Sequence, residues 1–398
     1  MSRRHEQSVN TPTSRGTASD SGPPVSLNPD TSRITQSTLN IPAENTERTE
    51  RSAAPPRPDT ASSVTDSDAE SSAPSLGTFS VGLSVDTDDS DADSAFFNND
   101  LLSSTVSATS SVYNFVEENG RTYHRYKEGR YWMPNDEQEQ QRLDLQHMIC
   151  IKVFRGQLAL APIENPGRVL DIGTGTGLWA IDFAIDHPEA DVLGTDLSPI
   201  QPEFVPPNCR FEVDDIEDLW VFSHKFDYIH ARHMVGSVKD FPKLFQVIYD
   251  NLNPGGWVEF QDYYVKLQSI DGTLDGTTLQ RWNNMLNHAL SFTGRSGLTA
   301  AKYKGWLRQA GFQNIEEEKF AVPGNTWAKG TEQKQLGFMQ MENILEGIHG
   351  MSMTLFTKFL GMSVEEVELM LVDVRKDLRN RDIHFYYPMM AVYAQKPA

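Results

Sequence analysis

The nine residues Val169–Gly177 constrain the fold more than any other stretch of the chain. Their sequence, VLDIGTGTG, begins as a buried strand would and ends in three glycines at alternate positions. The next segment, Leu178–Ala184, has the composition of a helix. A strand, a glycine turn and a helix start allow the backbone to touch a ligand without an intervening Cβ. We therefore expect a β–α unit with a ligand site at its turn.

A second strand and an acidic residue extend this pattern. Residues 191–195 have the composition of a strand, and Asp196 follows them directly. The spacing from Asp171 to Asp196 is close to that at which an acidic residue meets a ribose in nucleotide-binding βαβ units. The sequence thus predicts a site for a cofactor that carries a nucleoside.

Strands and helices alternate from Val169 onward, which indicates βαβ units and a parallel sheet. The strands are expected at 168–172, 191–195, 209–213, 226–230 and 256–261, with helices near 178–187, 240–251 and 298–310. Residues 314–322 and 384–395 are predicted to be a closing pair of strands, separated by a helical stretch at 331–380. Upstream, residues 137–161 carry apolar residues at helical spacing, and Asn135-Asp136 can cap that helix.

The first part of the chain has a different composition. Residues 1–110 are rich in Ser, Thr, Pro, Asp and Asn and poor in aromatic residues. Such a segment cannot bury enough apolar surface to offset its ordering entropy, so we predict a disordered acidic tail at 1–110 and an ordered domain at 113–398. Within the tail, an acidic stretch at 86–93 precedes the apolar cluster 96–102. It is either a peptide that folds against a partner or a solvated tail, and composition favours the solvated tail.

Charge and cysteine content exclude several classes of function. The formal net charge is -20 and no long basic run is present, so direct binding to nucleic acid is not expected. The two cysteines form neither a disulfide framework nor a metal site, and the histidines lack ligand spacing. Neither a signal peptide nor a membrane span is expected. The sequence favours a soluble protein of the nucleus or cytoplasm.

The residues around the glycine turn distinguish between cofactors. A glycine pattern alone is shared by dinucleotide dehydrogenases and methyltransferases. Asp171, directly before the turn, would repel a diphosphate but suits the positively charged amino-acid end of S-adenosylmethionine. Asp215 and Ile216 end the third strand, and this pair can accept the adenine amino group and cover the ring. We therefore predict S-adenosyl-L-methionine as the cofactor.

This order of motifs resembles the class I S-adenosylmethionine-dependent methyltransferases, and more closely the fungal LaeA-like group. That group contains regulators of secondary metabolism and development that associate with velvet proteins. The segments that carry the resemblance are Gly120–His124, Val169–Gly177, Asp196–Pro202, Val205–Phe211 and Phe226–Arg232. The resemblance implies an α/β fold of class I methyltransferase type: a Rossmann-like, seven-stranded, mostly parallel sheet with helices on both faces. It also implies velvet-type protein partners.

Cofactor-binding roles can be assigned to ten residues: Asp171, Gly173, Thr174, Gly175, Gly177, Asp196, Leu197, Asp215, Ile216 and Arg232. In this assignment the glycines provide the close backbone approach and Asp171 orders the loop and the methionine end. Asp196 accepts both ribose hydroxyls, and Asp215 with Ile216 holds adenine. The alternatives are that the glycines only make a tight turn and that Asp215 only caps a helix.

His230 and Arg232 follow the fourth strand, where ligands bind at the carboxyl ends of an open α/β sheet. His230 is the first candidate for a catalytic base if the methyl acceptor must lose a proton. Arg232 is expected to hold a carboxylate, either of the substrate or of the cofactor. The alternative is that neighbouring backbone satisfies both side chains. No metal site is predicted.

Several functions are compatible with these motifs. The leading hypothesis is an active methyltransferase that works as a regulator through protein partners. The second is a tailoring methyltransferase for a small metabolite, and the third is a scaffold that binds the cofactor without catalysis. A dehydrogenase is disfavoured by the position of Asp171. The sequence does not reveal the methyl acceptor or the oligomeric state.

Overall fold

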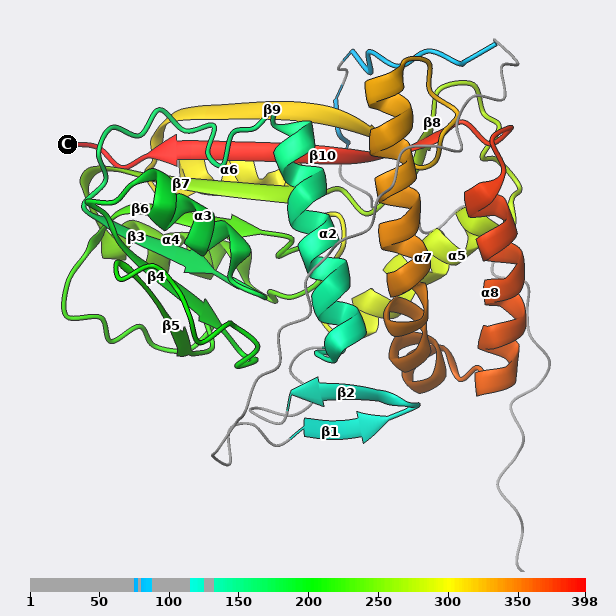
Figure 1. Cartoon of the computed structure of the whole chain (residues 1–398), viewed down its shortest axis with the longest axis horizontal. Coiled ribbons are helices and arrows are strands. Elements are labelled where there is room, and N and C mark those ends of the chain that lie inside the picture. Colours follow the sequence, from blue (N-terminus) through cyan, green and yellow to red (C-terminus); the bar gives the residue numbers. More distant parts are fainter. Residues whose placement is uncertain (1–74, 78–79, 88–114, 125–131) are drawn as a thin grey trace, which may run out of the picture. The chain divides into compact units, whose positions relative to one another are not determined.

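A central β-sheet organises the computed structural model, which describes residues 75–77, 80–87, 115–124 and 132–398 (Figure 1). The strand order is β5-β4-β3-β6-β7-β10, and β9 pairs with the free side of β10. The long strands are β3 (Arg168–Ile172), β4 (Asp191–Asp196), β5 (Cys209–Val213), β6 (Phe226–Arg232), β7 (Leu252–Tyr263), β9 (Gln313–Pro323) and β10 (Phe385–Gln395). The two-residue strand β8 (Gln268–Ser269) pairs with the start of β10 as an eighth member.

The five neighbouring strands β5, β4, β3, β6 and β7 run parallel to one another. Strand β10 is antiparallel to both of its long neighbours, β7 and β9. This is the expected seven-stranded, mostly parallel sheet, with β8 added. The strands expected from the alternating pattern are present, although β7 is longer at both ends than predicted. Because the parallel strands end at one edge of the sheet, the segments that follow β3, β4, β5 and β6 gather there.

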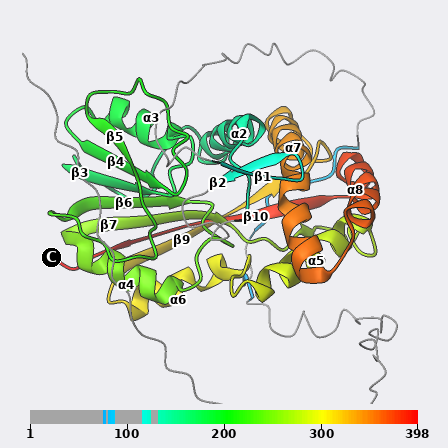
Figure 2. The same ribbon diagram turned by 90° about the horizontal axis from the view of Figure 1, so that it is seen from below.

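Helices cover both faces of the sheet, as Figure 2 shows. Helix α3 (Leu178–Asp186) lies on one face, and α4 (Phe241–Asn251) and α6 (Tyr303–Gln309) lie on the other. Beside the sheet, a further group of helices surrounds a core of its own: α2 (Glu137–Val153), α5 (Thr278–Phe292), α7 (Thr331–Leu360) and α8 (Val364–Arg379). Among the described residues, no helix is both long enough and apolar enough to cross a membrane.

Several helix predictions needed correction. The helix predicted at 137–161 ends at Val153, because Arg155 and Gly156 adopt positive φ angles of 55° and 87° that break it. The stretch predicted as helical over 331–380 is divided at Gly361, which takes the left-handed conformation with φ 69°. Helix α5 lies between the strand predicted at 256–261 and the helix predicted near 298–310, where no element was predicted. Asp136 caps α2 as expected, accepting a hydrogen bond from the Glu139 amide.

A β-hairpin precedes α2. Its strands are β1 (Phe115–Glu118) and β2 (Arg121–His124), joined by a two-residue Asn-Gly turn with positive φ at both positions, which matches the right-handed twist of a hairpin. The Arg121 guanidinium binds both oxygens of the Asp136 carboxylate, at 2.5 and 2.7 Å. The hairpin therefore fixes the N-terminus of α2. Residues 125–131, between β2 and α2, lie outside the described residues.

Residues 80–87 pair with the domain although they belong to the segment expected to be a tail. Val85 forms an antiparallel bridge with Ala328, and the Lys329 amide donates to the Ser84 carbonyl at 2.8 Å. Asp86 forms an ion pair with Lys334 at 2.5 Å. This differs from the expected tail because the apolar residues of the segment alternate with polar ones and can cover a surface. Most of 1–110, including the apolar cluster 96–102, lies outside the described residues.

We expect two truncations to differ in thermal stability. Removal of 1–74 should leave the unfolding midpoint unchanged, whereas removal of 1–110 should lower it by about 2–4 °C. The longer deletion removes a backbone bridge and an ion pair that together contribute about 1 kcal/mol. Differential scanning calorimetry of both variants measures this. Equal midpoints would show that the contact of 80–87 does not stabilise the domain.

Asp262 is a buried carboxyl group near the end of β7. It accepts hydrogen bonds from the Tyr303 hydroxyl at 2.8 Å and from the Val235 amide at 3.2 Å. Burial raises the pKa of Asp262 from 3.8 to about 7. The folded protein therefore holds this proton more tightly than the unfolded chain does. The stability that the protonated group contributes is fully present below pH 3.8 and is lost as the pH rises to about 7.

Replacement of Asp262 by Asn should remove this pH dependence, since the amide does not ionise. Relative to the wild-type protein, Asp262→Asn should gain stability between pH 5 and pH 8, by a few kcal/mol at most. Urea unfolding at both pH values measures the difference. A constant difference across this range would mean that Asp262 is already ionised at pH 5.

Candidate functional site

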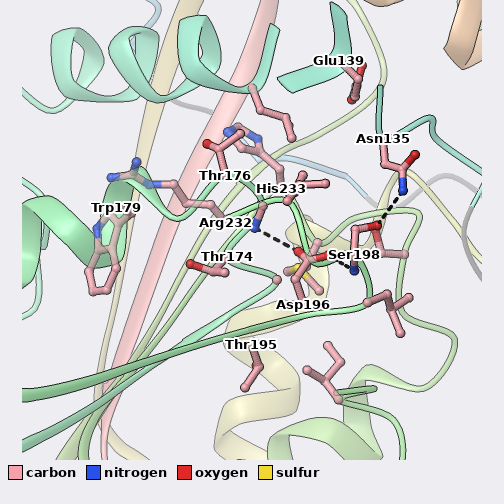
Figure 3. Close-up of a pocket in the computed structure, with 18 of the residues that line it drawn as sticks. Asn135, Glu139, Thr174, Thr176, Trp179, Thr195, Asp196, Ser198, Arg232 and His233 are labelled. Carbon is pink, nitrogen blue, oxygen red and sulfur yellow. Dashed lines mark hydrogen bonds between the residues drawn. The ribbon is translucent and has the colours of Figure 1, made fainter. Parts of the chain in front are cut away.

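A cavity of about 170 Å³ opens where β3, β4, β5 and β6 end, next to α2 (Figure 3). A cavity for one water molecule needs roughly 15 Å³, so this cavity can hold a larger ligand. Its lining residues come from five segments that are far apart in the sequence, within 134–147, 173–179, 195–200, 214–217 and 232–238. The sheet thus brings the predicted glycine turn and the predicted acidic residues to one place.

The glycine turn adopts left-handed backbone at Gly173, Gly175 and Gly177, with φ angles of 66°, 59° and 84°. A Cβ at Gly177 would lie 2.4 Å from the ring of Phe211, so this glycine is required for packing, and it does not line the cavity. A Cβ at Gly175 would meet only a methyl group of Leu143, at 3.5 Å. Gly173 and Gly175 do line the cavity. The close approach of backbone to ligand is therefore available at these two glycines.

Asp196 ends β4 and lines the cavity. One of its carboxylate oxygens accepts a hydrogen bond from the Gly175 amide and the other from the Ser198 amide, both at 2.9 Å. Burial raises its pKa, and these two amides oppose the shift. Each oxygen keeps a lone pair for a further donor. The group can therefore accept hydrogen bonds from two adjacent hydroxyls while it fixes the glycine turn.

Asp215 and Ile216 also line the cavity, together with Leu197. Asp215 is buried, and its carboxylate accepts a hydrogen bond from the Glu217 amide at 3.0 Å. No helix begins between β5 and β6, a stretch that the structure describes throughout, so this contact closes a turn and does not cap a helix. The two apolar side chains provide the kind of surface on which an aromatic base could lie.

Asp171 is buried and does not line the cavity. It accepts a hydrogen bond from the Thr174 hydroxyl at 2.6 Å and one from His230 Nδ1 at 2.8 Å. The residue is therefore in a position to order the glycine turn from below, through Thr174. A direct contact with the methionine end of a cofactor does not follow from this geometry.

His230 lies away from the cavity, which corrects its interpretation as a catalytic base. Its ring is fully buried and stacks on Trp179, with ring centroids 3.7 Å apart. The prediction placed His230 at the end of the strand, but β6 continues to Arg232, so the imidazole lies one layer below the ligand-binding edge. Burial lowers its pKa, and the hydrogen bond to Asp171 opposes this. Its place in the structure is to hold Asp171.

Arg232 does line the cavity and is largely buried. Its Nε donates to Gln261 Oε1 at 2.5 Å, and its Nη1 lies 3.2 Å from His147 Nδ1. The remaining nitrogen, Nη2, is buried and has no hydrogen-bond partner. In Figure 3 the guanidinium lies next to Trp179, on the other side of the view from Asp196 and Ser198. An unpaired guanidinium donor beside a cavity fits an anionic ligand group such as the carboxylate of S-adenosylmethionine.

Helix α2 supplies cavity residues that sequence reasoning did not identify: Glu139, Leu143, Gln146 and His147. Their helical period indicated a core helix, and no motif marked the residues that face a ligand. Glu139 is held in place by a buried ion pair with Arg142 at 2.7 Å.

His233 is a further cavity residue whose role was not predicted. It has a positive φ of 53°, which is uncommon outside glycine and typical of functional sites. Burial lowers its pKa well below the usual value, and the nearby Arg232 adds to this shift. The ring therefore stays neutral.

Comparisons with known proteins show the family of this chain. Residues 146–317 match a family model described as a methyltransferase domain. The chain is 40% identical to methyltransferase pytC of Aspergillus terreus, over 75% of this chain and 93% of that protein. It is 36% identical to the secondary metabolism regulator laeA of Aspergillus fumigatus, over 74% of this chain and 80% of that one. It is 35% identical to the protein-methionine methyltransferase laeA of Emericella nidulans, with the same coverage.

Gly175→Arg should abolish binding of S-adenosylmethionine, because the side chain would enter the cavity. We expect an affinity loss of at least about 100-fold by isothermal titration calorimetry, with the far-UV circular dichroism spectrum unchanged. Gly276→Arg is the matched control: Gly276 also has positive φ, at 75°, but a Cβ there meets nothing within 4 Å. If Gly175→Arg binds as tightly as the control, the cofactor lies elsewhere.

Proposed function

The chain belongs to the LaeA-like family of S-adenosylmethionine-dependent methyltransferases, and from this membership we propose that it is a regulatory enzyme of fungal secondary metabolism and development. In this proposal it methylates a protein in the nucleus or cytoplasm and works with protein partners of the velvet type. The observation that carries the proposal is the identity of 35–36% to relatives named as secondary metabolism regulator and as protein-methionine methyltransferase. The catalytic domain is taken as 113–398.

The cavity residues suggest how the cofactor would be held. Asp196 would accept the two ribose hydroxyls, with the Gly173–Gly175 turn beneath the cofactor. Leu197 and Ile216 would cover the adenine, and Asp215 would accept its amino group. Arg232 would bind the carboxylate through Nη2, the buried donor without a partner. This assignment uses groups that already line one cavity.

The chemistry requires little from the protein beyond alignment. The bound cofactor supplies a methyl group already activated by a sulfonium. The chain therefore has to align the acceptor with that methyl group and keep water out. Leu143 and His147 of helix α2 line one part of the cavity, and Trp179 in the first turn of α3 lines another.

A thioether is the acceptor that best fits these residues. Methionine sulfur has no proton to lose, so its methylation needs no general base. His230, the base expected from the sequence, is buried under Trp179. Two imidazoles do line the cavity, but burial lowers the pKa of His233 well below its usual value, which makes it a weak base, and His147 is hydrogen-bonded at both ring nitrogens. We therefore propose a methionine side chain of a protein as the acceptor.

A second candidate is methyl transfer to a small molecule. The 40% identity with a relative named as a methyltransferase, and not as a regulator, favours it. For such a substrate the candidate base would be His147, provided that its hydrogen bond to Asp182 is rearranged.

One labelling experiment separates these possibilities. The purified protein is incubated with S-adenosylmethionine carrying a labelled methyl group and with an extract of the native organism. We expect label in a protein fraction, released as dimethyl sulfide in hot alkali because a methylated thioether is a sulfonium, and none with Asp196→Ala. A co-purification from the same extract identifies the partners.

The other outcomes are equally informative. Label in the organic-soluble fraction would favour the small-molecule substrate. Cofactor binding without transfer of label to any fraction would contradict methyl transfer to components of this extract.

A further inference from the structure

Glu259 lies in the interior below the cavity, on β7, with no exposed surface. Its carboxylate accepts hydrogen bonds from the amides of Leu160 and Ala161, at 3.0 and 2.8 Å, and from the Tyr228 hydroxyl at 3.0 Å. A fourth donor is Gln261 Nε2, at 2.6 Å. Every one of these partners donates, which is the arrangement that an ionised carboxylate accepts. Burial and the neighbouring Glu259 raise the pKa of Tyr228, so its hydroxyl remains a donor.

The amide of Gln261 can take only one orientation in this setting. Its Nε2 donates to Glu259 and to the Leu158 carbonyl, at 2.6 and 3.2 Å. Both of these partners are acceptors only, so the amide oxygen has to point the other way, toward Arg232. A rotated amide would place its oxygen against the carboxylate and its NH2 group against the guanidinium. Glu259 thus sets the direction of the Gln261 dipole.

The orientation of Gln261 determines which donor of Arg232 is available. Gln261 Oε1 accepts from Nε, and His147 Nδ1 lies within reach of Nη1. Nη2 is left buried and without a partner, on a residue that lines the cavity. Gln261 is neutral, so it fixes the guanidinium without neutralising it, whereas a carboxylate at the same place would do both. The positive charge is therefore kept for a ligand.

We propose that Glu259 and Gln261 are positioning residues of the cofactor site: they hold Arg232 so that its one free donor selects a ligand with a carboxylate at the end remote from the adenosine. The β-sheet register supports this, because Arg232 stands opposite Gln261 and His230 opposite Glu259 on the parallel strands β6 and β7. The proposal rests on the proposed function, since the carboxylate concerned is that of S-adenosylmethionine. It adds a structural reason why the site would distinguish cofactor analogues that have this carboxylate from those that lack it.

Two ligands that differ only in this carboxylate test the proposal. S-adenosylmethionine and its decarboxylated analogue share the adenosine, the sulfonium and the amine. By calorimetry, the wild-type protein should prefer S-adenosylmethionine by roughly tenfold to hundredfold, the usual effect of one charge-assisted hydrogen bond. Gln261→Met should lose most of this preference, because it should weaken the binding of S-adenosylmethionine and leave the binding of the decarboxylated analogue unchanged. Arg232→Met should lose the same preference, and the double variant should lose no more.

A matched control separates positioning from general damage to the core. Gln340 is also fully buried and accepts a hydrogen bond from the Tyr263 hydroxyl at 3.0 Å, but it does not line the cavity. Gln340→Met should therefore keep the wild-type preference even if its thermal midpoint falls as far as that of Gln261→Met. If Gln261→Met does not fold, Glu259→Gln is the second variant, because it keeps the shape of the side chain and removes its charge. We expect it to lower the affinity for S-adenosylmethionine several-fold and to leave the affinity for the decarboxylated analogue unchanged.

The possible failures are distinguishable. A wild-type protein that binds neither ligand would contradict the proposed function, and this inference with it. A wild-type protein that binds both ligands equally would contradict only the role of Arg232 and its positioning residues. The positioning role would also be contradicted if Gln261→Met and Glu259→Gln retain the wild-type preference, or if they lower the affinity for both ligands to the same extent.

Discussion

Two carboxylates, one buried and one half-buried, hold the glycine turn, and the geometry of the cavity depends on them. Asp171 binds the Thr174 hydroxyl from below, and Asp196 binds the Gly175 amide from the next strand. A turn with left-handed residues at alternate positions has few backbone hydrogen bonds of its own, so side chains have to fix it. Because both carboxylates come from adjacent parallel strands, pairing of β3 with β4 assembles the turn and the ribose acceptor in one step.

The face of the sheet under α3 carries an unusual polar row for a protein interior. Asp171, His230 and Glu259 stand side by side on β3, β6 and β7. Burial of ionisable groups is unfavourable unless each is hydrogen-bonded. Asp171 and Glu259 meet this condition through the contacts described above, and His230 meets it at Nδ1, whereas its Nε2 is buried without a partner. We interpret the row as the support of the sheet edge above it, where Asp196 and Arg232 line the cavity.

The sequence was sufficient for those parts of the site that are local in the chain. Each of these parts can be recognised from a few consecutive residues. They are the glycine run that ends at Gly177, the strand that ends at Asp196, and the pair Asp215-Ile216. The contribution of α2 could not be found in this way, since Glu139 and Leu143 resemble the residues of any half-buried helix. His230 was misplaced because the length of β6 depends on its pairing with β7. The contact of 80–87 was missed because composition averages over the whole tail.

The charges around the cavity favour S-adenosylmethionine over a dinucleotide. Carboxylates of Asp196, Asp214, Asp215 and Glu217 are among the described lining residues. Glu139 also lines the cavity, but Arg142 pairs with it, and Arg232 is the only Lys or Arg among the described lining residues. A diphosphate would have to enter beside several like charges with one cation to offset them. A sulfonium and an ammonium gain from the same field, and the single carboxylate of the cofactor needs a single cation. The requirement is then geometric: that cation has to be placed at the correct end of the cavity and kept unneutralised, which a neutral glutamine oriented by a buried glutamate achieves.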